Sequence, residues 1–276
     1  MSENAKDSST AKGPALSAAN ISLTYSNGIR ALDSVSLNVA HGEFLAVIGP
    51  NGSGKSTLLR ALSGLQAIDE GSISLEGQAL TALDSPERAR RVALVPQSLD
   101  VLPGYSVSDF VLHGRYAHLS SWGLFSRHDR DVARECLRRV GAAEFLDRAM
   151  NEMSGGERQR VLIARALAQE SRTILLDEPT SALDLKHQLV VYRLIFEMHR
   201  HAGRTIVVVT HDLNLASQFA DRLVLMLNGK IVSDGTPANV LRRDVLETVY
   251  GSDLAFGAFE QTVAGGSRPW VLPWAR

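Results

Sequence analysis

The sequence predicts an α/β fold built on a mostly parallel β-sheet. Apolar runs of strand length alternate with segments of helical periodicity over most of the chain. One run, Phe44–Ile48, is continuously apolar, as expected of a parallel strand covered on both faces. A glycine-rich loop follows this run directly and leads into a helical segment at Thr57–Leu62. This order indicates a strand–loop–helix unit at the centre of the fold.

Composition indicates an ordinary globular protein. The 276 residues are 45% hydrophobic and 21% charged, which excludes a largely disordered or fibrous chain. The net charge of −1 gives no argument for nucleic acid as a partner. The single cysteine, Cys136, excludes an intrachain disulfide and is expected to serve packing. No secretory signal is recognised at the N-terminus, and no apolar run reaches the ~18 residues of a membrane span.

The first part of the chain is predicted to be a flexible tail followed by half-exposed strands. Residues 1–17 are rich in Ser, Ala and Lys and are predicted to form a flexible tail. The runs Ile21–Tyr25 and Ala31–Val39 alternate apolar and polar residues, which predicts half-exposed strands. Ser26–Gly28 between them is a turn signal.

The rest of the chain alternates strands and helices around one insert. Residues 107–149 are rich in Arg, His, Leu and Ala and are predicted to be a mainly helical insert. Further strands are expected at Ser72–Leu75, Val92–Val95, Thr173–Leu176, Thr205–Val209, Arg222–Met226 and Lys230–Val232. Further helices are expected at Asp131–Val140, Glu157–Gln169, Leu185–His201 and Leu213–Ala220.

The glycine-rich loop fits a phosphate-binding pattern. Its residues, in the order G-x-x-x-x-G-K-[ST], are Gly49, Pro50, Asn51, Gly52, Ser53, Gly54, Lys55 and Ser56. Glycines let backbone N–H groups converge on one point, and the following helix adds the positive end of its dipole. In such loops Lys55 would reach the β- and γ-phosphates and Ser56 would ligate Mg²⁺. An incidental glycine-rich turn is the alternative, and the strand and helix around the loop disfavour it.

A second candidate site lies where an apolar strand ends in two acids. Asp177 and Glu178 follow the run Thr173–Leu176. An unpaired buried carboxylate is costly, so these acids need a partner such as a cation. Asp177 suits the Mg²⁺ shell, and Glu178 suits the polarisation of an attacking water. Two solvated acids at a surface strand end are the alternative.

The segment Met153–Arg160, with Ser154, Gly155 and Gly156 at its centre, resembles the signature motif LSGGQ of ABC-transporter ATPases. Met153 stands for the usual Leu and Glu157 for the usual Gln, and neither change is expected to abolish activity. Four further positions match the family's other motifs. These are Tyr25 as the adenine-stacking aromatic, Gln97 as the Q-loop, Ser181–Asp184 as the D-loop and His211 as the switch histidine.

The resemblance implies a P-loop NTPase core with a mostly parallel sheet, an N-terminal antiparallel β subdomain and an inserted α-helical subdomain. On this basis residues 18–252 are expected to form the ABC ATPase domain, with the helical subdomain at about 100–155. Residues 253–276 are expected to be a C-terminal extension, in which Trp270 and Trp274 have no assigned role.

The resemblance also implies how the site works. The Ser154 hydroxyl and the N–H groups of Gly155 and Gly156 would face the γ-phosphate held by a second copy, with Asp184 at the seam. A head-to-tail dimer around two ATP molecules follows. The expected nucleotide contacts are Tyr25, Gly49, Pro50, Asn51, Gly52, Ser53, Gly54, Lys55, Ser56, Thr57, Ser154, Gly155, Gly156 and Asp184. The expected catalytic residues are Glu178 as base, His211, Gln97 and Lys55, and the expected Mg²⁺ ligands are Ser56, Gln97 and Asp177.

Finer features resemble one group within the family. Asp184–Gln188, Gly114–His118 with Ser126 and Asp129, and His211–Ala216 are similar to segments of ATPases that serve iron-siderophore, haem and vitamin B12 importers, although Ala117 stands where the group has Pro. This implies a haem or ferric-siderophore importer, with haem favoured. Its ATPase would lie peripherally on the cytoplasmic face of the bacterial inner membrane. Its partners would be a multi-span permease dimer and, indirectly, a periplasmic substrate-binding protein.

Several alternatives stay open at this point. The cargo could be vitamin B12 or another metal chelate, and the chain could be a soluble ABC ATPase without a transport role. Trp122, Leu124 and Phe125 could dock the permease or belong to the core of the insert. His199 and His201 are expected to be solvated, because residues two apart do not share a helix face.

Overall fold

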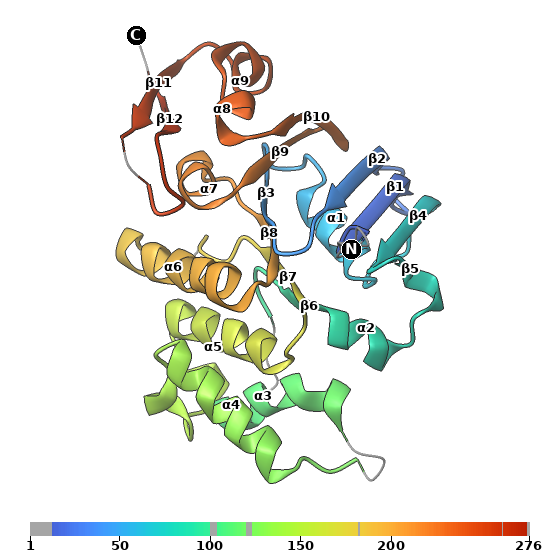
Figure 1. The fold of residues 1–276 in the computed structure, drawn as a ribbon, viewed down its shortest axis with the longest axis vertical. Coiled ribbons are helices and arrows are strands. Elements are labelled where there is room, and N and C mark those ends of the chain that lie inside the picture. Colours follow the sequence, from blue (N-terminus) through green and yellow to red (C-terminus); the bar gives the residue numbers. More distant parts are fainter. Residues whose placement is uncertain (1–12, 100–103, 120–122, 182, 261, 275–276) are drawn as a thin grey trace, which may run out of the picture.

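The computed structural model describes residues 13–99, 104–119, 123–181, 183–260 and 262–274. Its centre is a six-stranded sheet in the order β10-β9-β3-β8-β7-β6 (Figure 1). The strands are β3 (Phe44–Ile48), β6 (Val92–Val95), β7 (Thr173–Asp177), β8 (Thr205–Val209), β9 (Arg222–Leu227) and β10 (Lys230–Gly235). All neighbouring pairs are parallel except β9 and β10, which confirms the predicted mostly parallel sheet.

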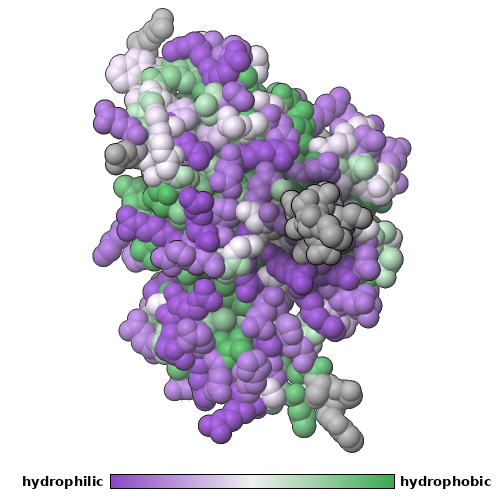
Figure 2. Space-filling view, viewed as in Figure 1, coloured by the Kyte–Doolittle hydropathy of each residue, from purple (hydrophilic) through white to green (hydrophobic). Residues whose placement is uncertain are grey.

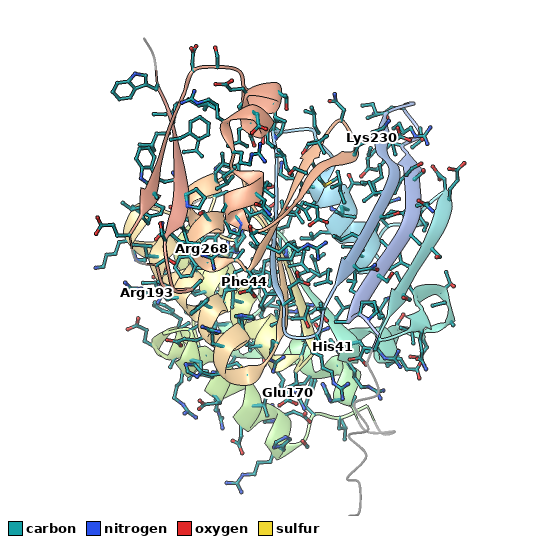
Figure 3. All side chains as sticks on the ribbon, turned by 45° about the horizontal axis from the view of Figure 1, so that its top comes forward. His41, Phe44, Glu170, Arg193, Lys230 and Arg268 are labelled. Atoms are coloured by element: carbon teal, nitrogen blue, oxygen red, sulfur yellow. The ribbon has the colours of Figure 1, made fainter. Side chains whose placement is uncertain are left out.

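The sheet is buried because its central strands are apolar on both faces. All five residues of β3, of β7 and of β8 are buried. Successive side chains of a strand point to opposite faces, so β3 feeds two cores. Phe44, at the middle of the molecule in Figure 3, belongs to the core shared with the helical layer. Leu45 and Val47 belong to the core under the second sheet.

The second sheet is antiparallel, in the order β2-β1-β4-β5, and packs over helix α1 (Lys55–Leu62). Its strands are β1 (Leu16–Thr24), β2 (Arg30–Val39), β4 (Glu70–Leu75) and β5 (Gln78–Ala79). Strand β1 begins at Leu16, so the predicted boundary of the tail at residue 17 is corrected. The pairing of β1 with β2 shifts register between Ala18 and Ile21. This irregularity breaks the alternation of apolar residues, which is therefore readable only from Ile21 onward.

Helices cover the sheet and form the insert. They are α2 (Ser85–Arg91), α3 (Val107–Leu112), α4 (Arg127–Arg139), α5 (Gly155–Ala168), α6 (Leu185–Ala202), α7 (Leu213–Phe219), α8 (Pro237–Val240) and α9 (Arg243–Tyr250). Short 3-10 turns lie at Leu80–Ala82, His113–His118, Ala143–Phe145 and Met150–Glu152. In the described part of the insert no named strand occurs, and α3, α4 and the first part of α5 gather at one end of the molecule (Figure 1). No helix of the described residues is both long and apolar enough to cross a membrane.

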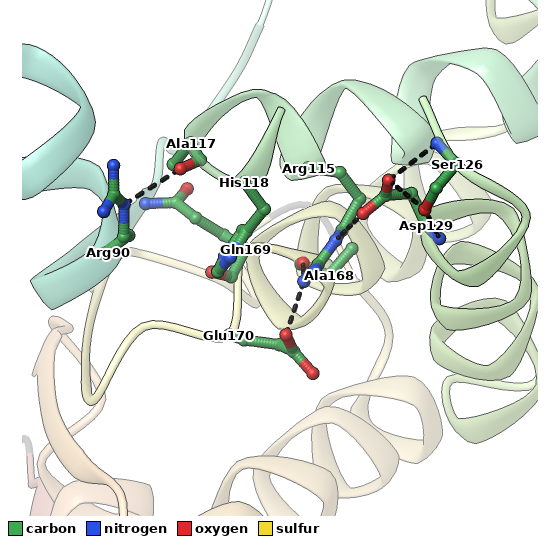
Figure 4. A network of polar contacts seen from close by, with 9 residues as sticks. All are labelled: Arg90, Arg115, Ala117, His118, Ser126, Asp129, Ala168, Gln169 and Glu170. Carbon is green, nitrogen blue, oxygen red and sulfur yellow. Dashed lines mark hydrogen bonds and ion pairs between the residues drawn. The ribbon is translucent and has the colours of Figure 1, made fainter. Parts of the chain in front are cut away.

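The Gly114–His118 segment, singled out from the sequence, connects helices of the insert through buried contacts. The Arg115 side chain is 4% exposed; its Nε donates to Asp129 Oδ1 at 2.9 Å, and its Nη1 donates to the Ala168 carbonyl at 2.8 Å (Figure 4). A Cβ at Gly114 would lie 2.4 Å from the carbonyl oxygen of Arg165, so only glycine fits there. The segment therefore joins α4 to the end of α5.

The same network reaches the central sheet. His118 Nε2 lies 2.9 Å from the Gln169 carbonyl oxygen, and the Gln169 amide donates to the carbonyls of Ala89 and Val92 at 2.6 and 2.8 Å. Arg90 of α2 donates back to the Ala117 carbonyl at 2.9 Å. The insert is thus tied to β6, the strand that runs into Gln97.

The C-terminal residues form a hairpin of β11 (Leu254–Phe259) and β12 (Arg268–Pro273), which lies against α7. The Trp270 ring covers Gly257 across the hairpin, where a Cβ would lie 2.1 Å from the ring. Trp270 therefore serves packing within the hairpin, while Trp274 is 60% exposed.

Two expectations about single residues have clear outcomes. His199 is buried, not solvated, because the last turn of α6 places its ring 5.7 Å from that of Phe44. His201 is exposed as predicted. Cys136 is buried in the core, as expected of a packing residue.

Of the candidate permease-docking residues, Phe125 packs against the core and Leu124 lies at the surface. The Phe125 ring stacks on His113 at 6.4 Å, while Leu124 is 72% exposed. Trp122 lies outside the described residues.

We predict that the Arg115–Asp129 pair carries much of the stability of the insert. Asp129→Asn removes the buried carboxylate from the Arg115 guanidinium and leaves it only the half-exposed Glu170, 2.6 Å from Nη1, so the unfolding free energy should fall by roughly 3 kcal/mol. Asp131→Asn, on the same helix, breaks only the exposed pair with Arg134 and should cost less than about 1 kcal/mol. Denaturant unfolding monitored by circular dichroism compares the two; equal losses would contradict the assignment.

The Arg115–Asp129 pair also predicts that the protein loses stability in acid. Burial by itself would raise the pKa of Asp129, but hydrogen bonds from Ser126 and Arg115 lower it to about 2. The native pKa lies below the ordinary value of 3.8, so the stabilisation is complete above that value and is lost as the pH falls through about 2. Thermal melts over that range should show a steeper loss for the wild type than for Asp129→Asn, and parallel curves would contradict this.

Candidate active site

The phosphate loop leaves β3 through backbone conformations that require glycine. Gly49 and Gly54 have φ values of 146° and 100°. A Cβ at Gly49 would lie 2.3 Å from the Met226 carbonyl oxygen, and one at Gly54 would lie 2.3 Å from that of Ala31. Gly54 is also the N-cap of α1 and supplies no side-chain cap. The first N–H groups of α1 are therefore left for a ligand at the mouth of the loop.

Lys55 lies folded into this loop. Its Nζ donates to the carbonyls of Gly49 and Pro50, both at 2.9 Å, and the residue is 5% exposed. Burial lowers the pKa of Lys55, and the nearby carboxylates Glu178 and Asp177 oppose that shift. The ammonium group is thus held at the loop and can exchange two carbonyl partners for an anion.

Ser56 and Asp177 meet at the other side of the loop. The Ser56 hydroxyl donates to Asp177 Oδ1 at 2.8 Å. Burial raises the pKa of Asp177, and the Ser56 hydrogen bond opposes that rise. This buried carboxylate has an oxygen neighbour and no paired cation among its hydrogen-bond partners, which is the environment expected of a metal ligand before the metal binds.

Glu178 has a strained backbone conformation, and its carboxylate contacts two further residues. Its φ is 46°, and its N–H donates to the Val209 carbonyl at 2.9 Å. Its Oε2 accepts from the Gln97 amide at 3.2 Å and lies 3.3 Å from His211 Nδ1. Strain of this kind persists where the surrounding structure fixes the residue, and here the contacts to Val209, Gln97 and His211 fix it.

Except for Asp177, which reaches the cavity only through its hydrogen bond from Ser56, these residues border an open cavity of about 880 Å³. It is lined by Tyr25, Asn27, Ile29, Ala31, residues 49–57, Gln97, Glu178, His211 and Tyr250. Tyr25 stands at one wall, with its hydroxyl 3.0 Å from Thr57 Oγ1. The structure therefore brings together every predicted site residue of the loop, the Q-loop and the switch position.

Sequence reasoning missed four of the lining residues. Asn27 and Ile29 belong to the turn after Tyr25. An apolar residue at such a turn is the usable sequence signal, and the Ile29 side chain is 59% exposed. Ala31 contributes chiefly its backbone beside Gly54. Tyr250 comes from the end of α9, and nothing in its sequence surroundings connects it to the loop.

Among the described residues, those of the signature and the D-loop do not line this cavity. Ser154 is the N-cap of α5, where its hydroxyl and the Glu157 side chain form a capping box. Asp184 caps α6 by accepting from the His187 N–H at 2.9 Å. Leu183 packs on Gly156, where a Cβ would be 3.1 Å from the Leu183 side chain. The signature therefore lies outside the cavity, beside Leu183, while Ser181 of the D-loop accepts from the Gln97 amide at 3.5 Å and so lies next to the cavity residues.

Comparison with known proteins shows to which family the chain belongs. The sequence model of the ABC transporter family matches residues 32–181, just over half of the chain. This chain belongs to the ABC transporter family. It is 43% identical over 244 residues to a hemin import ATP-binding protein of Rhodococcus jostii, covering 88% of this chain and 80% of the relative. It is 36% identical over 244 residues to the ferric enterobactin transport ATP-binding protein of Escherichia coli, covering 88% and 89%.

Solved structures of the family share the fold. A putative metal-chelate type ABC transporter in an inward-facing conformation has a TM-score of 0.81 and 30% identity, with 95% of this chain and 98% of that chain covered. The dimeric cassette MJ0796 in a post-hydrolysis state with ADP and Pi has a TM-score of 0.74 and 32% identity, with 80% and 98% covered. These similarities confirm the predicted family and fold class, and the role of each site residue stays a prediction.

We predict that Gly54→Ala abolishes nucleotide binding. The added methyl would meet the Ala31 carbonyl and force the loop open. A methyl at Gly52 would lie in open space, so Gly52→Ala costs only the backbone strain of a φ of 79°. Titration with a fluorescent ATP analogue should show no saturable binding for Gly54→Ala and binding reduced by less than about tenfold for Gly52→Ala. Equal affinities would mean that the loop does not close around the ligand as described.

Proposed function

We propose that this chain is the ATP-hydrolysing subunit of a bacterial importer that moves haem or a ferric siderophore through a separate membrane permease. The observation that carries the proposal is the convergence of Lys55, the Ser56–Asp177 pair and the Glu178–His211 pair on one cavity. The named functions of its hemin and ferric enterobactin relatives support the cargo.

A cobalamin importer is the second candidate for the cargo. The chain is 38% identical to a cobalamin import ATP-binding protein of Halobacterium salinarum over 86% of its own length, although it spans only 59% of that relative. The full-length matches to iron-chelate proteins favour haem or a siderophore.

The proposed reaction converts ATP and water into ADP and phosphate by in-line attack. Tyr25 would stack on the adenine, and the loop N–H groups with Lys55 would hold the phosphate chain. Glu178 lies where it can accept a proton from the attacking water, while His211 can contact the γ-phosphate. Because the transition state spreads charge over phosphate oxygens, fixed donors of this kind supply most of the catalysis.

The residues present fit Mg²⁺ as the cofactor. Mg²⁺ prefers hard oxygen ligands and commonly takes one or two carboxylates together with substrate phosphates. Ser56 and Asp177 supply a hydroxyl and a carboxylate 2.8 Å apart, and Gln97 is the third proposed ligand. The described residues contain no cluster of three or more His, Cys, Asp or Glu side chains suited to a metal, so the ion would arrive with the nucleotide. Bound there, Mg²⁺ would neutralise charge developing on the phosphates.

A second copy would complete each site. Ser154 heads α5 with N–H groups and a helix dipole suited to an anion, yet it lies outside the cavity of its own chain. Leu185, directly after Asp184, is 71% exposed, and Figure 2 shows hydrophobic residues along the edge of the molecule near α6. A head-to-tail dimer would cover this apolar edge and set each signature over the partner's phosphate loop.

The permease would dock beside the Q-loop. A groove of about 390 Å³ lies between α2, β6 and α5, and Pro96 and Leu99, on either side of Gln97, line it together with Leu65, which is 68% exposed. A permease segment seated there would touch the backbone that carries Gln97. We propose that the chain attaches in this way, peripherally, at the cytoplasmic face of the inner membrane, with the periplasmic binding protein acting through the permease.

We predict that Glu178→Gln stops hydrolysis and traps the dimer. The amide keeps the shape and the contacts to Gln97 and His211 but cannot accept a proton, so turnover should fall by at least about 10²-fold while ATP still binds. Size-exclusion chromatography with ATP should show a dimer for the variant. Unchanged turnover would remove Glu178 from the role of base.

We predict that cargo stimulates the ATPase only in the complete transporter. The chain, its permease and the binding protein reconstituted in proteoliposomes should hydrolyse ATP faster when hemin or a ferric siderophore is enclosed with the binding protein. Cobalamin serves as the comparison cargo. A response to cobalamin alone would favour the second candidate, and no response to any of the three would refute the importer proposal.

A further inference from the structure

The C-terminal hairpin packs against α7 and is hydrogen-bonded to it. Helix α7 begins two residues after His211. Asn214 donates from Nδ2 to the Val271 carbonyl at 3.0 Å, and its Oδ1 accepts from the Val271 N–H at 2.9 Å. One side chain thus binds the backbone of β12 as a neighbouring strand would. In the sequence, residues 211–216 matched the importer group as a segment, and only His211 received a role; the structure gives Asn214 a partner 57 residues away.

Two further hydrogen bonds join the hairpin to α7 and to the residue after it. The buried Ser217 hydroxyl donates to the Pro269 carbonyl at 2.6 Å. Arg268, labelled in Figure 3, donates to the Ala220 carbonyl at 2.9 Å, directly after the end of α7. The helix is therefore fastened to β12 near its start, at its middle and at its end.

His211 needs such support. Its side chain is 59% exposed and has one ion-pair contact, to Glu178 at 3.3 Å. On one side its backbone follows β8, and on the other it enters α7 through Asp212, which caps the helix by accepting from the N–H groups of Asn214 and Leu215 at 2.9 Å. A helix of seven residues is not stable by itself, so the position of its first turn depends on what it packs against.

The same C-terminal segment reaches the cavity directly. Tyr250, at the end of α9, lines the same cavity as His211. Burial raises the pKa of Tyr250 to about 12, so its hydroxyl stays protonated. Arg243 of the same helix lies 4.6 Å over the Phe256 ring of β11, which ties α9 to the hairpin.

We propose that Asn214 is a positioning residue: by clamping α7 to β12 it holds His211 in reach of Glu178 and of the γ-phosphate. The C-terminal extension is then part of the ATPase and not an appendage. This inference rests on the proposed role of His211 in the catalytic site.

Asn214→Ala in the full-length chain tests the clamp. Turnover should fall by about tenfold, because small displacements of a catalytic group are costly, while the KM for ATP changes by less than about twofold. Ser217→Ala removes a different bond of the same clamp and should shift kcat in the same direction. Asn239→Ala, at an exposed position of α8, is the matched control and should leave both constants unchanged.

A spectroscopic readout separates the clamp from the chemistry. The chain has eight histidines, and the His211 ring signal can be assigned by its absence in the spectrum of His211→Ala. In Asn214→Ala and in Ser217→Ala this signal should shift or broaden while the signals of distant histidines stay in place.

The outcomes are distinguishable. A folded Asn214→Ala with wild-type kcat and an unmoved His211 signal overturns the inference. If that variant fails to fold, Ser217→Ala decides by the same two measurements. If His211→Ala itself keeps full turnover, the proposed role of His211 is wrong, and the ring signal still reports whether the clamp positions it.

Discussion

The parallel pairing of three neighbouring strands is the constraint on which the site depends. Val47 of β3 and Asp177 of β7 both pair with Val209 of β8. The three strands therefore end at the same level of the sheet, and whatever follows each of them must meet at that edge. The phosphate loop follows β3, Glu178 follows β7 and His211 follows β8 by two residues. A shift of one residue in either register would also turn the apolar side chains of the strand to the wrong face.

Around that edge lie the residues that we propose form one half of a hydrolytic site. The cavity holds the groups that would bind phosphates and polarise water, while the signature serine lies on a separate helix and is presented outward. The capping box at Ser154 keeps this helix start intact without using its N–H groups for contacts inside the cavity. Under the proposed function, such a division would make assembly of two copies a requirement of turnover, and it would give a permease that moves the insert a means of controlling ATP hydrolysis.

Much of this arrangement is predictable from sequence, for identifiable reasons. The continuous apolar runs of β3, β7 and β8 predict buried parallel strands, and the motifs after them name the site residues in order. The start of β1 was misplaced because a register irregularity hides its alternation. His199 was misjudged because spacing alone does not show that the last turn of α6 faces Phe44. Tyr250 and the Asn214–Val271 bonds escaped because contacts made by the C-terminal segment leave no local pattern.

Mixing two inactive variants tests the two-copy site most directly. Lys55→Ala removes the phosphate-loop lysine, and Ser154→Arg places a bulky cation where the partner's nucleotide would lie. In a mixed dimer both defects fall in one site, and the other site pairs an intact loop with an intact signature. The account predicts that each variant alone is inactive and that their mixture regains ATP hydrolysis. A mixture that forms dimers with ATP yet stays as inactive as its components would contradict it.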